Sequence, residues 1–227
     1  MRTRERLADE LYVLPAGPGR LMNSYLIADT VVDSGLRWSG RLIARALRGA
    51  TVRAHALTHA HFDHAGSAGW LCRELEVPLL VGAADADAME SGRVDSHGGA
   101  AINALTRLFP TRPHPVERRL KEGDLVGGFE VLDVPGHSPG AVAYWRAADR
   151  VLLCGDTITN LAGSARRPRL MAVPGFLDHD TPMNRRSLAK LTDLRPSLVC
   201  FGHGPPVTDP GLFTDAVLRL ADPSPGG

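Results

Sequence analysis

Apolar residues recur along the chain with two different spacings. Short apolar runs, such as residues 11–14 and 151–154, are typical of buried strands. Residues 39–48 and 184–194 instead place apolar residues three and four positions apart, as on one face of a helix. The two patterns alternate along the chain, which predicts an α/β fold.

The same reading gives the order of the elements. Strands are predicted at residues 11–14, 23–28, 30–33, 54–58, 78–81, 128–134, 141–145, 151–154 and 198–203. Helices are predicted at residues 39–48, 65–74, 83–90, 100–109, 184–194 and 211–221. Residues 1–10 are interpreted as a polar lead-in and residues 223–227 as a frayed end.

Two regions lack a clear pattern. Residues 83–122 include a glycine-bearing loop at 91–99 and a proline-rich stretch at 110–115, and a lid over a site is one interpretation of this region. Residues 157–182 form a longer loop than connections usually need, which favours a functional role.

Composition and charge narrow the class of protein. No linker composition divides the chain, so residues 1–227 are expected to form a single domain. The net charge of +1 favours neither nucleic acid nor a membrane surface as a partner, and leaves a small-molecule substrate as the expectation. No signal peptide or membrane span is visible, and the three cysteines have no paired spacing, so we expect a cytoplasmic protein. The oligomeric state is left open.

The strongest chemical signal is the segment His-Ala-His-Phe-Asp-His at residues 59–64, where four of six residues can bind metal. It follows a predicted strand, so His59 and His61 are expected on the same side. Asp63 and His64 come after the strand has ended, where the chain can turn them toward a second point. Imidazole and carboxylate suit a borderline divalent ion such as zinc.

This segment resembles the H-x-H-x-D-H motif of the metallo-β-lactamase superfamily. Residues of the superfamily's other ligand types follow in the expected order, with His137 in a Pro-Gly-His-Ser-Pro-Gly turn, Asp156 after an apolar run and His203 after another. The resemblance implies a four-layer αββα sandwich. Two mixed sheets would face each other with helices outside, and metal ions would lie where the strand-end loops meet.

The resemblance also implies a dinuclear metal-dependent hydrolase. The ligands would be His59, His61 and His137 for one ion, Asp63, His64 and His203 for the other, and Asp156 for both. The cofactors would be two divalent ions, with zinc as the first choice and iron or manganese as alternatives. A hydroxide between the ions would attack a small ester, thioester or lactone carbonyl, since metal lowers the pKa of bound water to about 7. Asp63 would also be catalytic, because it orients this nucleophile.

Other superfamily activities leave alternatives. Glyoxalase II and the homoserine-lactone lactonases are closest in ligand set, but the first adds a C-terminal helical domain not expected here, and the second a tyrosine that residues 157–182 lack. An aspartate at position 156 disfavours β-lactamase activity. An iron-dependent persulfide dioxygenase-like enzyme and a non-enzymatic metal-binding scaffold are the alternatives to hydrolysis.

Substrate contacts are predicted mainly in the loop at residues 157–182. His179 is a candidate general acid or oxyanion donor. Phe176 and Leu177 are predicted to form an apolar substrate wall, with the loop's arginines nearer solvent; the alternative is that both merely pack the loop onto the body. Tyr25 and Asn160 are further substrate-binding candidates.

Overall fold

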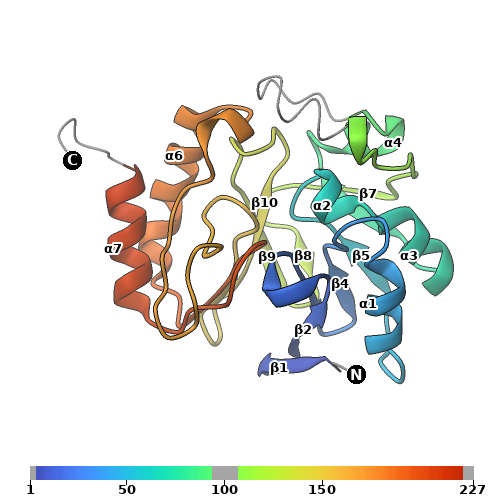
Figure 1. The fold of residues 1–227 in the computed structure, drawn as a ribbon, viewed down its shortest axis with the longest axis horizontal. Helices are drawn as coiled ribbons and strands as arrows, with labels where there is room; N and C mark the ends of the chain where they lie inside the picture. Colours follow the sequence, from blue (N-terminus) through green and yellow to red (C-terminus); the bar gives the residue numbers. More distant parts are fainter. Residues whose placement is uncertain (1–3, 94–106, 222–227) are drawn as a thin grey trace.

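The computed structural model describes residues 4–93 and 107–221, and its strands form two sheets that face each other (Figure 1). In these residues the first sheet consists, in spatial order, of β1 (Glu5–Ala8), β2 (Leu11–Pro15), β3 (Asn23–Ile27), β4 (Thr30–Val32), β5 (Ala54–Ala56), β6 (Leu79–Gly82) and β7 (Arg118–Leu120). The second consists of β12 (Leu198–Cys200), β11 (Val151–Leu153), β10 (Val142–Arg146), β9 (Phe129–Asp133) and β8 (Leu125–Val126). Both sheets mix parallel and antiparallel neighbours, as predicted.

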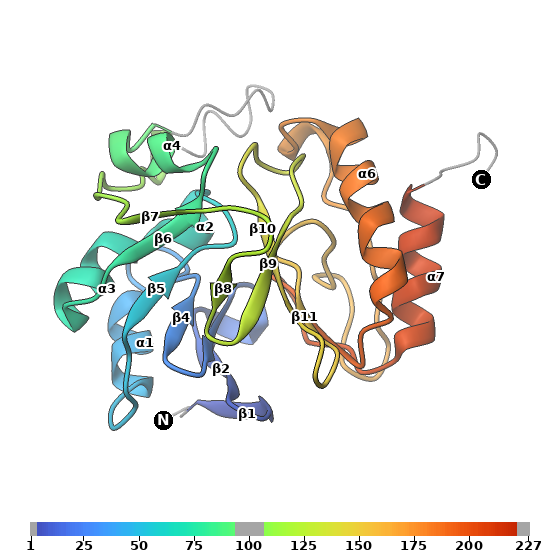
Figure 2. The same cartoon turned by 180° about the vertical axis from the view of Figure 1, so that it is seen from behind.

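Helices cover the outer face of each sheet (Figures 1 and 2). The first sheet is covered by α1 (Gly40–Ala46) and α3 (Ala68–Leu75), and the second by α6 (Thr181–Leu191) and α7 (Pro210–Ala221). The predicted four-layer αββα sandwich is therefore confirmed. Shorter elements are α2 (Phe62–Ala65), α4 (Ala86–Ser91) and the 3-10 helices η1 (Pro18–Arg20), η2 (Gly175–Leu177) and η3 (Thr192–Leu194).

The alternation of side chains along the strands separates the inner core from the two outer cores. In β3, Tyr25 and Ile27 pack between the sheets, whereas Leu26 packs with α1 and α3. In β11, Leu153 belongs to the inner core and Leu152 to the layer beneath α6 and α7. Because successive strand residues point to opposite faces, every buried strand contributes to two cores.

Differences from the predicted elements have local causes. Residues 1–10 were interpreted as a polar lead-in, but residues 5–8 form β1. None of the side chains of β1 is buried, so the sequence has no apolar run that would predict this strand. Strand β7 was not predicted from the sequence either, because two of its three residues are exposed. Helix α6 begins at Thr181, earlier than predicted, because the Asp180 carboxylate accepts a hydrogen bond from the Met183 amide at 2.8 Å and caps it.

Some predictions fall on residues outside the described part of the chain. The helix predicted at 100–109 and the loop predicted at 91–99 lie largely within residues 94–106, and the frayed end lies beyond residue 221. The lid at residues 83–122 stays a prediction. Among the helices of the described residues, none has both the length and the apolar content to cross a bilayer.

Candidate metal centre

The histidine-rich motif lies at the end of β5. His59 and His61 lie in the irregular turn after this strand, and Asp63 and His64 belong to the single helical turn α2. The amides of His64 and Ala65 donate to the His61 carbonyl at 3.0 and 2.8 Å, which closes this turn. The curl predicted after the strand is therefore a short helix that redirects the last two ligands.

The remaining ligands lie on loops of the second sheet. His137 is in the turn between β9 and β10, Asp156 follows β11, and His203 follows β12. The strands β11 and β12 are parallel, so both present their carboxyl ends at the same edge. The loops of the two sheets meet there, which brings all the predicted ligands together.

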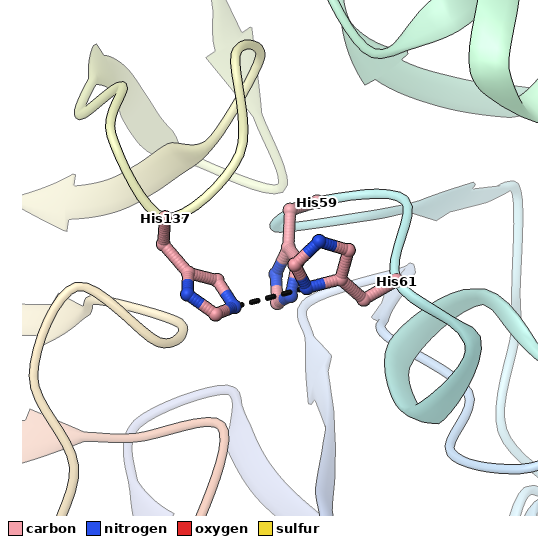
Figure 3. A group of neighbouring side chains, drawn as sticks. All are labelled: His59, His61 and His137. Atoms are coloured by element: carbon pink, nitrogen blue, oxygen red, sulfur yellow. Dashed lines mark hydrogen bonds between the residues drawn. The ribbon is translucent and has the colours of Figure 1, made fainter. Parts of the chain in front are cut away.

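Three histidines form what we call the imidazole triad: His59, His61 and His137. The ligand atoms of this group lie within 4.8 Å of one another. His61 Nδ1 is 3.0 Å from His137 Nε2, and both rings point into the same space from different loops (Figure 3). All three side chains are buried.

A second group, the carboxylate triad, consists of Asp63, His64 and His203. His203 Nε2 lies 3.3 Å from Asp63 Oδ2 and 3.4 Å from His64 Nε2. Asp156 connects the two groups, since its Oδ2 lies 3.0 Å from His203 Nε2 and 3.7 Å from His137 Nε2. Asp156 therefore lies beside members of both triads, and its role as a ligand of two ions stays a prediction.

Several observations indicate that this space fits cations. His59 Nε2 and Asp156 Oδ1 are buried and, within the described residues, have no hydrogen-bond partner. Buried polar atoms rarely stay unsatisfied, and a metal ion would satisfy both. A Cβ on Gly202 would lie 2.0 Å from Asp156 Oδ1, so glycine leaves room for the carboxylate. The imidazole and carboxylate donors match divalent ions of the zinc, iron and manganese type.

The pKa shifts differ between the triads. Burial lowers the pKa of His59 and brings that of His61 to about 3, so both rings are neutral and offer lone pairs at neutral pH. Burial also opposes the charged form of His64, but the carboxylates of Asp156 and Asp33 outweigh it and raise the pKa of His64 to about 10.

The carboxylates of the centre stay ionised. Burial raises the pKa of Asp63, but the hydrogen bond from His203 and the charge of His64 outweigh it and lower that pKa to about 2. His203 and His64 hold the pKa of Asp156 well below its ordinary value in the same way. Negative ligands beside neutral imidazoles are a suitable electrostatic environment for a divalent cation.

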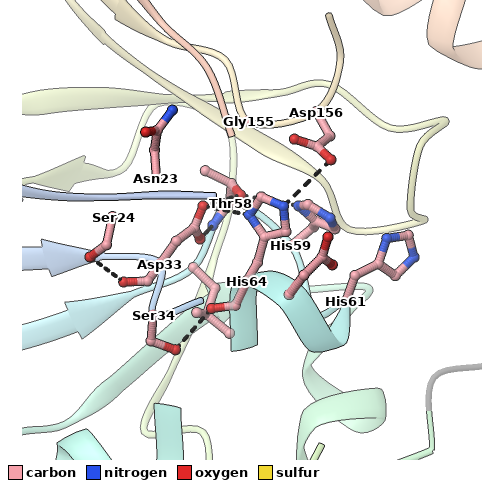
Figure 4. A network of polar contacts seen from close by, with 12 residues as sticks. Asn23, Ser24, Asp33, Ser34, Thr58, His59, His61, His64, Gly155 and Asp156 are labelled. Carbon is pink, nitrogen blue, oxygen red and sulfur yellow. Dashed lines mark hydrogen bonds and ion pairs between the residues drawn. The ribbon is translucent and has the colours of Figure 1, made fainter. Parts of the chain in front are cut away.

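The ligand rings are held in place by a further layer of contacts. His64 Nδ1 donates to Asp33 Oδ2 at 2.8 Å (Figure 4). His137 Nδ1 donates to Asp178 Oδ1 at 3.1 Å, and His203 Nδ1 donates to the Leu21 carbonyl. Such partners fix ring orientation and increase ligand basicity.

Asp85 joins the two loops of the imidazole triad. Its Oδ2 accepts from the Ala60 amide at 2.9 Å and from Ser138 Oγ at 2.7 Å. Its Oδ1 accepts from the Gly140 amide at 2.6 Å. Asp33, Asp85 and Asp178 were not predicted from the sequence. The sequence shows only that each is an acidic residue beside a buried or ligand-bearing segment.

A cavity of about 350 Å³ opens beside the centre. Five candidate metal ligands belong to its lining and define what we call its inner end: His61, Asp63, His137, Asp156 and His203. The rest of the lining is almost entirely apolar: Phe62, Thr159, Leu161, Ala162, Met171, Ala172, Val173, Pro174 and Leu177. Among the described residues that line this cavity, none is lysine or arginine.

The predicted substrate residues lie in different places. Leu177 lines the cavity, whereas Phe176 is 59% exposed and outside the lining. Tyr25 is buried between the sheets, where its hydroxyl donates to the Phe201 carbonyl at 2.8 Å. Asn160 is buried and bonded to backbone groups of two loops. The structure therefore does not bring Phe176, Tyr25 or Asn160 to the cavity.

His179 lies on the other side of His61. With Asp85 and Arg93 it lines a second cavity of about 330 Å³, and its amide donates to the His137 carbonyl at 3.2 Å. Its backbone thus supports a metal ligand, and a catalytic role for its side chain stays a prediction.

Fold and site together define an αββα protein with a His/Asp cluster able to bind metal ions. The sequence profile of the metallo-beta-lactamase superfamily matches residues 17–203, so the chain belongs to this superfamily. The match ends at the last metal ligand of the cluster.

Similar proteins agree with this assignment. The chain is 26% identical over 208 residues to the probable metallo-hydrolase YflN of Bacillus subtilis (strain 168). This alignment covers 82% of this chain and 78% of that protein. The chain is 30% identical over 136 residues to a hydroxyacylglutathione hydrolase of Ectopseudomonas mendocina (strain ymp), covering 52% and 42% respectively. The di-iron-bound structure of TTHA1623 superposes with a TM-score of 0.63 at 32% identity, covering 86% of this chain and 93% of that chain.

Proposed function

We propose that this chain is a dinuclear metal-dependent hydrolase of small esters, thioesters or lactones. The observation that carries the proposal is the position of Asp156, whose Oδ2 lies near ligands of both triads at the inner end of an open cavity. A structural zinc site is usually closed by four protein ligands, whereas this centre faces a space that a substrate can enter. That contrast disfavours the scaffold alternative.

The imidazole triad would hold one ion, the carboxylate triad a second, and Asp156 both. Zinc is the first choice for these donors, although iron and manganese accept them too, and the similar TTHA1623 is described in a di-iron-bound form. When bound, the ions would lower the pKa of water and polarise the substrate carbonyl.

In this proposal Asp63 orients the attacking water. Its side chain is 25% exposed at the cavity, and its low pKa keeps it an acceptor at neutral pH. It can therefore accept a hydrogen bond from the attacking water. The water oxygen would bond to the carbonyl carbon, the bond to the leaving oxygen or sulfur would break, and the water proton would end on that leaving group.

The test combines metal analysis with a substrate panel. Purified metal-replete protein should contain two ions per chain and hydrolyse at least one ester, thioester or lactone. Asp63→Asn should lose most of this activity, while Asp215→Asn, an exposed carboxylate change on α7, should retain it. One iron per chain with persulfide-dependent oxygen uptake would favour the dioxygenase, and two ions without any hydrolysis would favour the scaffold.

A further inference from the structure

The loop that follows Asp156 is closed by one antiparallel bridge between Thr159 and Met171. Thr159 and Met171 pair through two backbone hydrogen bonds, of 2.9 and 3.0 Å. The Asn160 side chain closes the loop, since its Oδ1 accepts from the Arg169 amide at 2.9 Å. One wall of the cavity is therefore built on ordered backbone.

Asn160 also fixes this loop relative to the metal centre. Its Nδ2 donates to the Pro205 carbonyl at 2.9 Å, and its amide donates to the His203 carbonyl at 3.1 Å. A Cβ on Gly204 would lie 2.2 Å from the Asn160 carbonyl oxygen, so the two loops are in close contact. The wall thus has a defined distance from the carboxylate triad, which a surface that selects substrates by shape requires.

The wall presents apolar surface to the cavity. Leu161 and Met171 are 50% and 43% exposed, and both line the cavity. Phe62 belongs to the same lining, and its ring stacks on Phe109 with centroids 5.6 Å apart. An apolar group in contact with these side chains would remove apolar surface from water, which is favourable.

Charge in the cavity is confined to its inner end. The carboxylates of Asp63 and Asp156 are there beside the imidazoles of the candidate ligands, and none of the described residues of the lining is lysine or arginine. The loop's arginines, Arg166, Arg167 and Arg169, are exposed and outside the lining. An arm that carried a carboxylate would therefore lie on apolar walls without a counter-ion, which is unfavourable.

We infer that the substrate of the hydrolase proposed above, on which this inference rests, carries an uncharged aliphatic arm. The arm lies against Phe62, Leu161 and Met171, which line the same cavity. The scissile carbonyl lies at the inner end, beside Asp63. Because the bridge and the Asn160 hydrogen bonds hold this loop, the wall is a determinant of specificity.

A charge introduced into the wall tests the inference. Zinc-loaded protein is assayed with para-nitrophenyl hexanoate and with the para-nitrophenyl monoester of adipic acid, which has the same carbon count and a terminal carboxylate. We expect kcat/KM to favour the hexanoate by at least tenfold, and Leu161→Lys to lower this preference at least tenfold. Leu218→Lys is the matched control, because Leu218 is 54% exposed on α7, and it should leave the preference within about twofold.

Equal hydrolysis of both esters by the parent, or equal behaviour of the two lysine variants, would overturn the inference. Met171→Lys replaces Leu161→Lys if melting curves show that the latter is unfolded. Binding separates this inference from the proposed function: the affinity of zinc-loaded protein for straight-chain hydroxamic acids should rise roughly fourfold per methylene from acetyl to hexanoyl. A rise in affinity without any ester hydrolysis would refute the proposed hydrolase function but support the aliphatic arm. An affinity that does not change with chain length would refute the aliphatic arm.

Discussion

The two triads of the metal centre differ in depth and in charge. The imidazole triad is deeply buried, with His59, His61 and His137 only 1%, 4% and 3% exposed. The carboxylate triad is buried at His64, which is 1% exposed, but opens to the cavity at His203 and Asp63, whose side chains are 14% and 25% exposed. The comparison suggests a division of work, in which the deep triad anchors metal and the open triad meets substrate.

The residues that hold the two triads in place also differ. The loops of the imidazole triad are joined by Asp85, which accepts hydrogen bonds from both. In the carboxylate triad, His64 is held by the buried Asp33 carboxylate and His203 by a backbone carbonyl. Each triad therefore has a carboxylate behind one histidine, Asp178 behind His137 and Asp33 behind His64, but Asp85 joins loops only in the imidazole triad.

The largest expected effect comes from removing the carboxylate of the open triad. Asp63→Ala should lower kcat at least 100-fold, roughly the scale of losing a key electrostatic group, and should reduce the metal content from two ions to one. Because the imidazole triad and the core are untouched, the melting temperature of the metal-free protein should change little. Kinetics, elemental analysis and thermal unfolding check this, and activity within a few-fold of the parent would refute the division of work.

A matched pair of variants tests whether each support serves its own triad. Asp33→Asn and Asp178→Asn keep the side-chain shape but remove the charge that His64 and His137 contact. Each should weaken metal binding at its own triad by roughly 10- to 100-fold and leave the other within a few-fold. Competition with a chromophoric chelator measures the two affinities. If Asp33→Asn weakened metal binding equally at both triads, the idea that each carboxylate supports only its own triad would be wrong.

The clustering of the candidate ligands could be predicted from the sequence, whereas their supports could not. The ligand types stand in a short motif and in turns after apolar runs, and the strand pattern gives these turns a common edge. Asp33 and Asp178 act on histidines 31 and 41 residues away, so their roles depend on how separate loops meet. No local pattern carries that information.

The substrate wall shows the same limit. Residues 157–182 were correctly read as irregular for most of their length, but neighbours in η2 diverge, with Leu177 on the cavity and Phe176 in solvent. Successive residues of a 3-10 helix point about 120° apart, so hydrophobicity alone cannot assign a side. The fold was easier to predict than the substrate wall, because alternating apolar strands and amphipathic helices specify the layers. Exposed strands such as β7 have no apolar pattern from which to predict them.

A pH series should separate the triads further. In the metal-free protein the pKa of His64 is raised to about 10 and that of His203 to about 12, so both are protonated at neutral pH and metal must displace these protons. Affinity at the carboxylate triad should therefore rise with pH, by about tenfold per unit for each proton displaced, from about pH 7 to about pH 9. His59 and His61, with lowered pKa values, are already neutral there and add no such slope. Calorimetry in buffers of different ionisation enthalpy counts the protons, and equal slopes for both ions would contradict this.

The smallest expected effect concerns Thr58, whose hydroxyl contacts a support of the carboxylate triad and a member of the imidazole triad. Its Oγ1 donates to Asp33 Oδ2 at 2.8 Å and accepts from His59 Nδ1 at 3.1 Å (Figure 4). Thr58→Val keeps the shape and removes both hydrogen bonds, so each triad should lose roughly fivefold in metal affinity, the equivalent of about 1 kcal/mol. Thr58→Ser, which keeps the hydroxyl, should restore both affinities. If Thr58→Val weakens only the carboxylate triad, the hydroxyl serves Asp33 alone, and the two halves have no side-chain connection through this residue.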